Sequence, residues 1–173
     1  MDYLCKPASR ILLRSYAQSL REMFDFSNDG RIDVISMLDR VPDVLHGVRC
    51  DVLEDSDLPK NVPAATTLLP NGEMIIKIKD STYQHALRGS GGYRSHIVHE
   101  ICHAFLIKQG HRPLIARKFN DGEIPAYRAA EWQAKALCGE VMMPYEATKG
   151  MTAEEIADKY QVSLAAAQQR LRY

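Results

Sequence analysis

The chain lacks the features that mark several large classes of protein. It has no apolar run of transmembrane length and no signal-peptide pattern at its start, so no membrane segment is expected. Its 4 cysteines form no C-x-x-C pair, which predicts reduced thiols and a cytoplasmic setting. Neither sign of charge prevails, because 22 basic residues balance 22 acidic ones, and nothing suggests a strong polyanion binder. Internal repeats and low-complexity segments are also missing.

What remains is typical of a small globular protein. The 173 residues, 46% of them hydrophobic, can bury a sizeable core and fit one domain, 1–173. Within it we expect an N-terminal helical part (1–30), a core (31–150) and a C-terminal segment resembling a helix-turn-helix (151–173). The fold class predicted is α+β, with a small mixed or antiparallel sheet packed beside one central helix.

Periodicity and turn residues place the individual elements. Helices are expected at 9–24, 33–45, 95–106 and 126–143, and strands at 48–52, 64–69 and 73–79. Pro42 should bend or end the second helix, and Pro144 should stop the fourth. The stretch 80–95, which contains Gly89, Ser90, Gly91 and Gly92, is interpreted as a flexible link between the last strand and the central helix.

The central helix carries the motif H-E-x-x-H at His99, Glu100 and His103. Positions four apart lie on one helical face, so both imidazoles can reach one metal ion. Glu100 lies about 100° round the helix and can reach a water on that metal. The competing interpretation, two core histidines with ordinary hydrogen bonds, is weaker, because two histidines and a glutamate are costly to bury without a partner.

A catalytic zinc site needs a third protein ligand and an open fourth position. The best candidate is Glu131, at the start of the fourth helix and on the edge of its apolar face. Taken alone, Glu131 is better explained as a solvated first-turn glutamate favoured by the helix dipole.

Three segments together resemble the ImmA/IrrE family of metallo-endopeptidases. They are 98–103 (VHEICH), 131–135 (EWQAK) and 140–144 (EVMMP), within a similarity that spans roughly 32–171. The resemblance implies one Zn²⁺ per chain, held by His99, His103 and Glu131. It also implies a protein substrate, a helix-turn-helix repressor whose cleavage derepresses genes of a prophage, mobile element or stress response. The chain departs from the family pattern at Cys102, where Gly is usual, and at Lys135, where Asn is usual.

The mechanism expected for such a site assigns Glu100 as general base, taking the proton of the water and delivering it to the leaving amine. The strand at 75–79 is expected to pair with an extended substrate segment. His96 and Tyr127 are the possible substrate or oxyanion contacts, and His85, Tyr93 and His111 are further oxyanion candidates that the sequence does not rank. A plain hydrogen-bonding role for His96, and a space-filling role for Cys102, are the simpler interpretations.

The segment 152–171 supports a rival interpretation. Thr152 can cap its first helix, with Glu155 completing a capping box, and Ser163 can cap the second. A DNA reader needs basic residues on the second helix, where this sequence has mainly alanines. We therefore expect a helical pair packed under the core and no DNA binding. The alternative functions are sequestration of a repressor without cleavage and DNA binding through 152–171.

Overall fold

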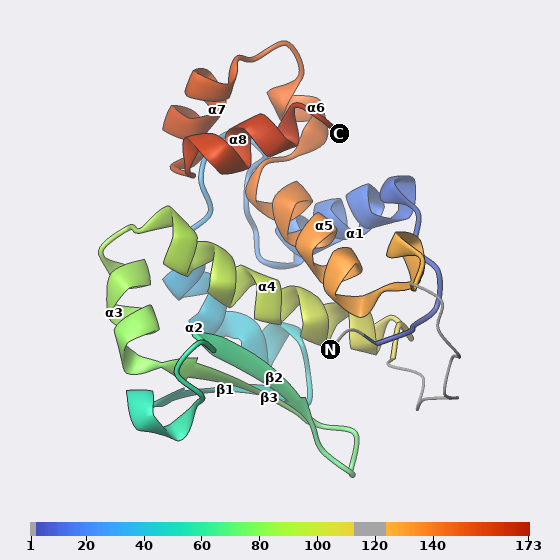
Figure 1. The fold of residues 1–173 in the computed structure, drawn as a ribbon, viewed down its shortest axis with the longest axis vertical. Coiled ribbons are helices and arrows are strands. Elements are labelled where there is room, and N and C mark those ends of the chain that lie inside the picture. Colours follow the sequence, from blue (N-terminus) through green and yellow to red (C-terminus); the bar gives the residue numbers. More distant parts are fainter. Residues whose placement is uncertain (1–2, 113–123) are drawn as a thin grey trace.

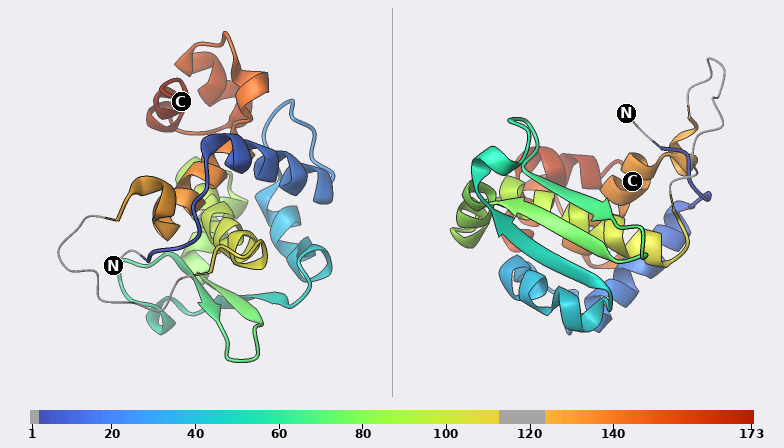
Figure 2. Two further views of the ribbon diagram at one scale, coloured as in Figure 1. Left: turned by 90° about the vertical axis from the view of Figure 1, so that its right-hand side faces the viewer. Right: turned by 90° about the horizontal axis from the view of Figure 1, so that it is seen from below.

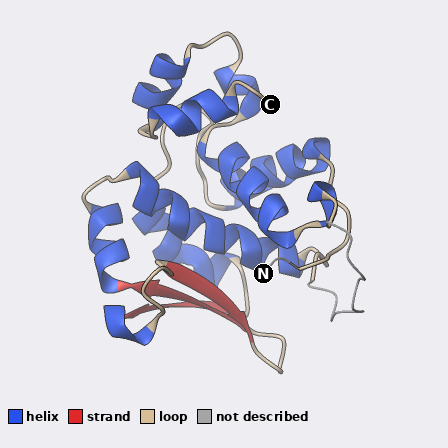
Figure 3. Cartoon of the chain, in the orientation of Figure 1, coloured by secondary structure: helices blue, strands red, loops and turns tan. Residues whose placement is uncertain are grey.

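The computed structural model describes residues 3–112 and 124–173, and within these ranges the fold is α+β, as predicted. Eight α-helices accompany one three-stranded sheet (Figure 1). The strands form a layer at one side of the molecule and the helices are stacked on the other (Figure 3). The long helix α4 (Gly91–Lys108) crosses the covered face of the sheet, and α5 (Ala130–Met142) packs against α4 from the opposite side. The apolar core fills the space between these layers.

The first two helices lie where the sequence predicted them. Ser9 caps α1 (Arg10–Met23) by accepting a hydrogen bond from the Leu12 amide, and Asp33 caps α2 (Val34–Val44) in the same way. Pro42 lies inside α2 and does not end it, because the helix continues for two further residues.

The sheet is mixed, with the order β1-β3-β2. β1 (Val48–Leu53) runs parallel to β3 (Met74–Lys79), and β2 (Ala64–Leu68) runs antiparallel to it. β3 is therefore the central strand, and both of its edges are already paired. The prediction that the strand at 75–79 receives a substrate segment is wrong, because no free backbone edge is left there. Among the described residues, the outer edges of the sheet belong to β1 and β2.

The stretch interpreted as a flexible link is also different. Its first half forms the helix α3 (Asp80–Leu87), and α4 already begins at Gly91. Gly91 is explained by a close contact: a Cβ at this position would lie 2.9 Å from the carbonyl oxygen of Gln161. The glycine marks the place where a distant part of the chain touches the start of α4, which no local pattern shows.

The C-terminal part contains more short elements than expected. The predicted helix 126–143 is divided into a 3-10 turn, η2 (Ala126–Arg128), and α5, because Ala129 between them is extended. Three short helices then follow Pro144 at the end of the molecule opposite the sheet (Figures 1 and 2). They are α6 (Tyr145–Thr148), α7 (Ala153–Tyr160) and α8 (Leu164–Arg170).

The capping predictions for this segment are confirmed. Thr152 and Glu155 form a complete capping box at α7, and the Ser163 hydroxyl accepts a hydrogen bond from the Ala166 amide at the start of α8. Among the described residues, no helix combines the length and the apolar character needed to cross a membrane.

Candidate metal centre

The candidate site is built on the middle of α4. One side of this helix is buried in the core, with Ile97, Val98 and Ile101 fully inaccessible. The opposite side carries His99 and His103, whose side chains keep 21% and 17% of their exposure. The spacing of four residues places the two rings next to each other along the helix, edge to face, with centroids 4.6 Å apart and planes nearly perpendicular.

The third member of the site comes from α5. Because the chain leaves η2 through the extended Ala129, Glu131 falls in the first turn of α5 and faces α4. Its Oε2 atom lies 3.2 Å from Nε2 of His99, and its Oε1 atom lies 3.3 Å from Nε2 of His103. The two Nε2 atoms are 3.1 Å apart. The structure thus brings together the three residues that the sequence analysis selected as metal ligands.

These distances fit a small metal ion. Two ligand atoms bound tetrahedrally to zinc, at about 2.0–2.1 Å each, lie about 3.3 Å from each other. All three separations in the cluster are close to that value. Two imidazoles and one carboxylate are also a donor set typical of catalytic zinc sites, which leave the fourth position open. The residues therefore fit a three-ligand metal centre.

The protonation states favour metal binding as well. Burial, assisted by the neighbouring His103, lowers the pKa of His99 to about 4, so its imidazole is neutral at neutral pH. The hydrogen bond from His103 lowers the pKa of Glu131 to about 2, against the opposing effect of burial. A neutral imidazole and an ionised carboxylate are the forms that bind a metal ion, so few protons would have to be displaced.

Glu100 lies next to this cluster and is held by a residue that the sequence analysis missed. Burial raises the pKa of Glu100, while the charge of His103 and a hydrogen bond from Thr66 act to lower it. The Thr66 hydroxyl, on β2, lies 2.8 Å from Oε2 of Glu100 and 3.0 Å from its backbone oxygen. A threonine in a short strand carries no signal of such a contact, because the contact exists only once β2 packs on α4.

The remaining candidates have different surroundings. His96, one turn before His99, lines the same cavity as His99. Tyr127 lies in η2 with about half of its side chain exposed, and none of its described contacts is with the metal cluster. His111 is buried, with Nδ1 3.0 Å from the Lys6 carbonyl oxygen, which is a structural role. His85 and Tyr93 stack on each other at 4.4 Å. The oxyanion roles of His96 and Tyr127 stay predictions.

Cys102 and Glu140 are accounted for by their packing. Cys102 is completely buried beside the site, and burial raises the pKa of its thiol well above the usual range. A thiol in that state fills space and is a poor nucleophile. Glu140, an alternative carboxylate on α5, is buried and paired with Arg14 and Arg170. It therefore belongs to a different cluster from His99 and His103.

Comparison with models of known protein families gives a match. The family model Peptidase_M78, described as the IrrE N-terminal-like domain, matches residues 64–172. The matched span covers more than half of the chain and runs from the start of β2 to the end of α8. It therefore includes the three metal-site residues, Glu100 and Thr66. No curated protein matches the chain.

Proposed function

The chain belongs to the Peptidase_M78 (ImmA/IrrE) family of metallopeptidases, and we propose that it is a zinc-dependent endopeptidase. The observation that carries the proposal is the convergence of His99, His103 and Glu131, with ligand atoms 3.1–3.3 Å apart. This arrangement leaves one position open, as a catalytic zinc site requires and a structural one does not. When bound, zinc supplies an activated water and an electrophile for the scissile carbonyl.

Glu100 is the general base of the proposed reaction. Its carboxylate accepts a proton from the attacking water and donates it to the amine that leaves. Burial moves the pKa of Glu100 upward, towards the range in which a carboxyl group both accepts and returns a proton. Thr66 fixes Oε2 at 2.8 Å, so the other oxygen is free to face the water. Thr66 acts through Glu100 and is a positioning residue.

The substrate backbone is proposed to bind along the outer edge of strand β2. Within the described residues β2 pairs only with β3, so its outer edge offers unpaired amide and carbonyl groups. An extended substrate segment can add to that edge by backbone hydrogen bonds. Because Thr66 is the middle residue of β2 and contacts Glu100, a segment bound there passes the catalytic carboxylate.

The substrate we propose is a protein, a helix-turn-helix repressor, and this part rests on the family resemblance. DNA binding is not part of the proposal. Ala166 and Gln169 of α8, with the cap residue Ser163, line a cavity that His99 also borders, and Arg170 is buried against Glu140. Of the two arginines at the end of α8, only Arg172 is then left exposed, which is too little charge on this helix for phosphate binding.

The test is the substitution Glu100→Gln, which keeps the shape of the side chain but removes the proton acceptor. Cleavage of a mixed peptide library, followed by mass spectrometry, should slow by at least about 100-fold, with zinc content unchanged. Glu154→Gln, at an exposed position of α7, is the matched control and should cleave normally. Undiminished cleavage by Glu100→Gln would remove Glu100 from the mechanism. A wild-type protein that binds a repressor tightly but never cuts it would favour sequestration.

A further inference from the structure

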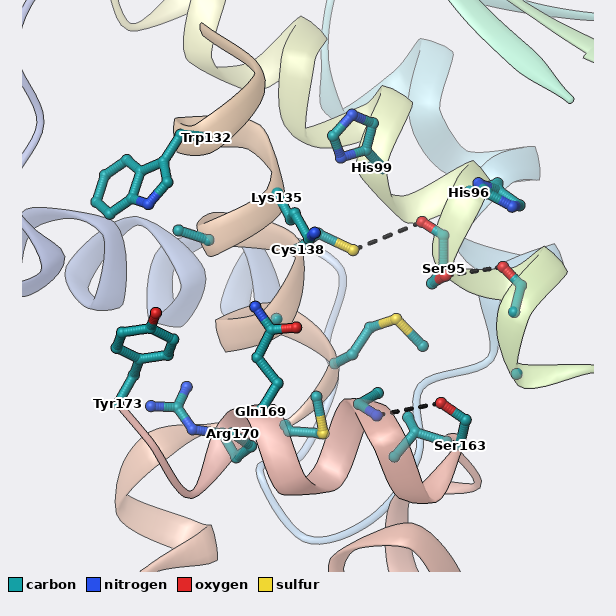
Figure 4. A pocket seen from close by; sticks show the side chains of 18 of the residues that line it. Ser95, His96, His99, Trp132, Lys135, Cys138, Ser163, Gln169, Arg170 and Tyr173 are labelled. Carbon is teal, nitrogen blue, oxygen red and sulfur yellow. Dashed lines mark hydrogen bonds between the residues drawn. The ribbon is translucent and has the colours of Figure 1, made fainter. Parts of the chain in front are cut away.

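A cavity of about 500 Å³ opens beside the metal cluster and extends beneath α8 (Figure 4). His99 is part of its wall, so the cavity and the metal site are continuous. Its three sides are the first turns of α4, the exposed side of α5 and the inner face of α8. Figure 4 shows His96 and His99 on α4 opposite Trp132 and Lys135 on α5, with Gln169 and Arg170 of α8 closing the far end.

The helix α8 spans this cavity because it is held at both ends. At its start, the buried Arg94 of α4 donates a hydrogen bond of 2.8 Å to the carbonyl oxygen of Gln161, and Gly91 allows the close approach. At its end, Arg170 pairs with the buried Glu140 at 2.8 Å. Between these anchors Ala167 packs in the apolar core, whereas Ala166 and Gln169 line the cavity. These two contacts hold α8 in place, so the far wall of the cavity has a fixed position.

The lining combines apolar walls with positive charge. Its apolar part is formed mainly by small or flexible side chains: Ala136, Met142, Met143, Val162 and Ala166. Three cationic side chains also line it, Arg10, Lys135 and Arg170, while none of the lining residues is Asp or Glu. Such a cavity suits an occupant that is apolar and carries a negative charge.

Arg170 indicates independently that the occupant carries an oxygen acceptor. Its side chain is only 4% exposed, and its Nη1 atom bonds to Glu140. Its Nη2 atom is buried, and no group in the described part of the chain accepts a hydrogen bond from it. A buried guanidinium donor without an acceptor costs free energy, and buried polar groups are nearly always paired. A small shift of the Arg170 side chain towards the cavity would let a ligand oxygen there accept from this donor.

We propose that this cavity is the specificity site for the substrate, and that it binds the segment beside the scissile bond through an apolar side chain and a carboxylate. The inference rests on the proposed function. The apolar side chain packs against Met142, Met143 and Ala166, and the carboxylate is received by Arg170 and Lys135. Sites of 300–1,000 Å³ hold ligands larger than a single side chain, so the cavity has room for both groups.

The position of the cavity favours a substrate segment over a free small molecule. A peptide held at the metal centre has its neighbouring residues within reach of the cavity, because His99 borders both. Binding of a free carboxylate-bearing metabolite would not require the cavity to be continuous with the metal site. We therefore expect the peptidase to prefer substrates with acidic and apolar residues beside the scissile bond.

The first test needs no cleavage. Trp132 is the only tryptophan of the chain and lines the cavity, so its fluorescence reports occupancy. The metal-loaded protein is titrated with 4-phenylbutyrate and with the neutral 4-phenylbutyramide, which differ only in the charged group. The carboxylate should give a saturable change, and the amide should bind about tenfold more weakly, since hydrogen bonds to charged groups are the stronger ones. Equal binding of the two probes would overturn the proposal.

Matched variants locate the binding. Ala166→Phe fills the cavity from α8 and should abolish the response, whereas Ala165→Phe changes a neighbour outside the lining and should preserve it. Lys135→Glu should weaken carboxylate binding about tenfold or more, and Arg88→Glu, an exposed charge reversal outside the lining, should not. A response that survives in Ala166→Phe would mean that the carboxylate binds the metal alone, and would contradict the assignment.

The second test examines the substrate. In a mixed peptide library, the wild type should cut preferentially where an acidic residue lies within about three positions of the cleaved bond and a large apolar residue adjoins it. Lys135→Glu should reduce the acidic enrichment at least threefold, and Arg88→Glu should not. Cleavage without such enrichment would overturn the inference and leave the proposed function intact. If the wild type cuts nothing, the proposed function fails, and the Trp132 titration still decides the chemistry of the cavity.

Discussion

The site has two parts: the metal face, formed by His99, His103 and Glu131, and the cavity face, formed by the cavity beneath α8. They differ in how far apart in the chain their residues lie. The metal face depends on His99 and His103, four positions apart on one helix, with Glu131 added from the next long helix. The cavity face depends on contacts such as that between Arg94 and Gln161, which are 67 positions apart. A short motif fixes the chemistry of the first face, whereas the second exists only when α8 is docked. The proposed metal chemistry and the selectivity proposed for the cavity are thus encoded separately in this chain.

The largest effect is expected on the metal face. His99→Ala, His103→Ala and Glu131→Ala should each abolish stable binding of zinc, because two remaining ligands cannot complete a three-ligand site. His96→Ala, one turn earlier on α4, is the control and should keep about one zinc per chain by elemental analysis. If Glu131→Ala retains full occupancy, the third ligand has been misassigned; Glu123, which lies outside the described residues, would be examined next.

A large effect on stability is expected on the cavity face. Arg170→Met removes a partner of the buried Glu140 and should lower the free energy of unfolding by about 3 kcal/mol in urea titrations. Arg172→Met, at an exposed position two residues later, should change it by less than about 0.5 kcal/mol. Equal stability of the two variants would show that Arg170 does not anchor α8.

A smaller effect is expected where the sheet meets the metal face. Thr66→Val removes the hydroxyl that holds Oε2 of Glu100 and should lower kcat about tenfold with KM little changed. Thr66→Ser retains the hydroxyl and should restore most of the rate. A change in KM alone, or failure of serine to restore kcat, would indicate that Thr66 serves only the packing of β2.

The smallest effect is expected in the number of protons that His99 releases when zinc binds. Because burial lowers the pKa of His99 to about 4, only about one molecule in a hundred has this imidazole protonated at pH 6. An ordinary histidine would be about three-quarters protonated there. Zinc binding at pH 6 should therefore release almost no proton from His99, which calorimetry in buffers of different ionisation enthalpy measures. In the metal-free protein, an NMR titration in which the His99 imidazole becomes protonated with a midpoint near about 6.5, the value for an ordinary histidine, would contradict that assignment.

Sequence analysis predicted what local spacing controls. The pair His99 and His103 follows from the period of the helix, and the caps at Thr152 and Ser163 follow from side-chain oxygens placed before helical stretches. The third site residue, Glu131, was selected through the family resemblance, because a first-turn glutamate alone has a simpler explanation.

The errors share a cause, which is dependence on tertiary contacts. Strand order decided that β2 and not β3 has a free edge, and no strand pattern contains that order. Gly91 looked like part of a flexible link, but it accommodates Gln161 from the far end of the chain. Thr66 and the cavity lining were missed for the same reason, since their partners lie on other elements.

The most direct test of the central claim is X-ray absorption spectroscopy of the zinc-loaded protein. The account predicts one zinc per chain with only nitrogen and oxygen neighbours at about 2.0–2.1 Å, including two imidazoles, and loss of that signature in His99→Ala. Cys102 and Cys138 lie buried nearby on α4 and α5. A sulfur neighbour at about 2.3 Å would show that a thiolate holds the metal, and would contradict the open, three-ligand site on which the proposed peptidase depends.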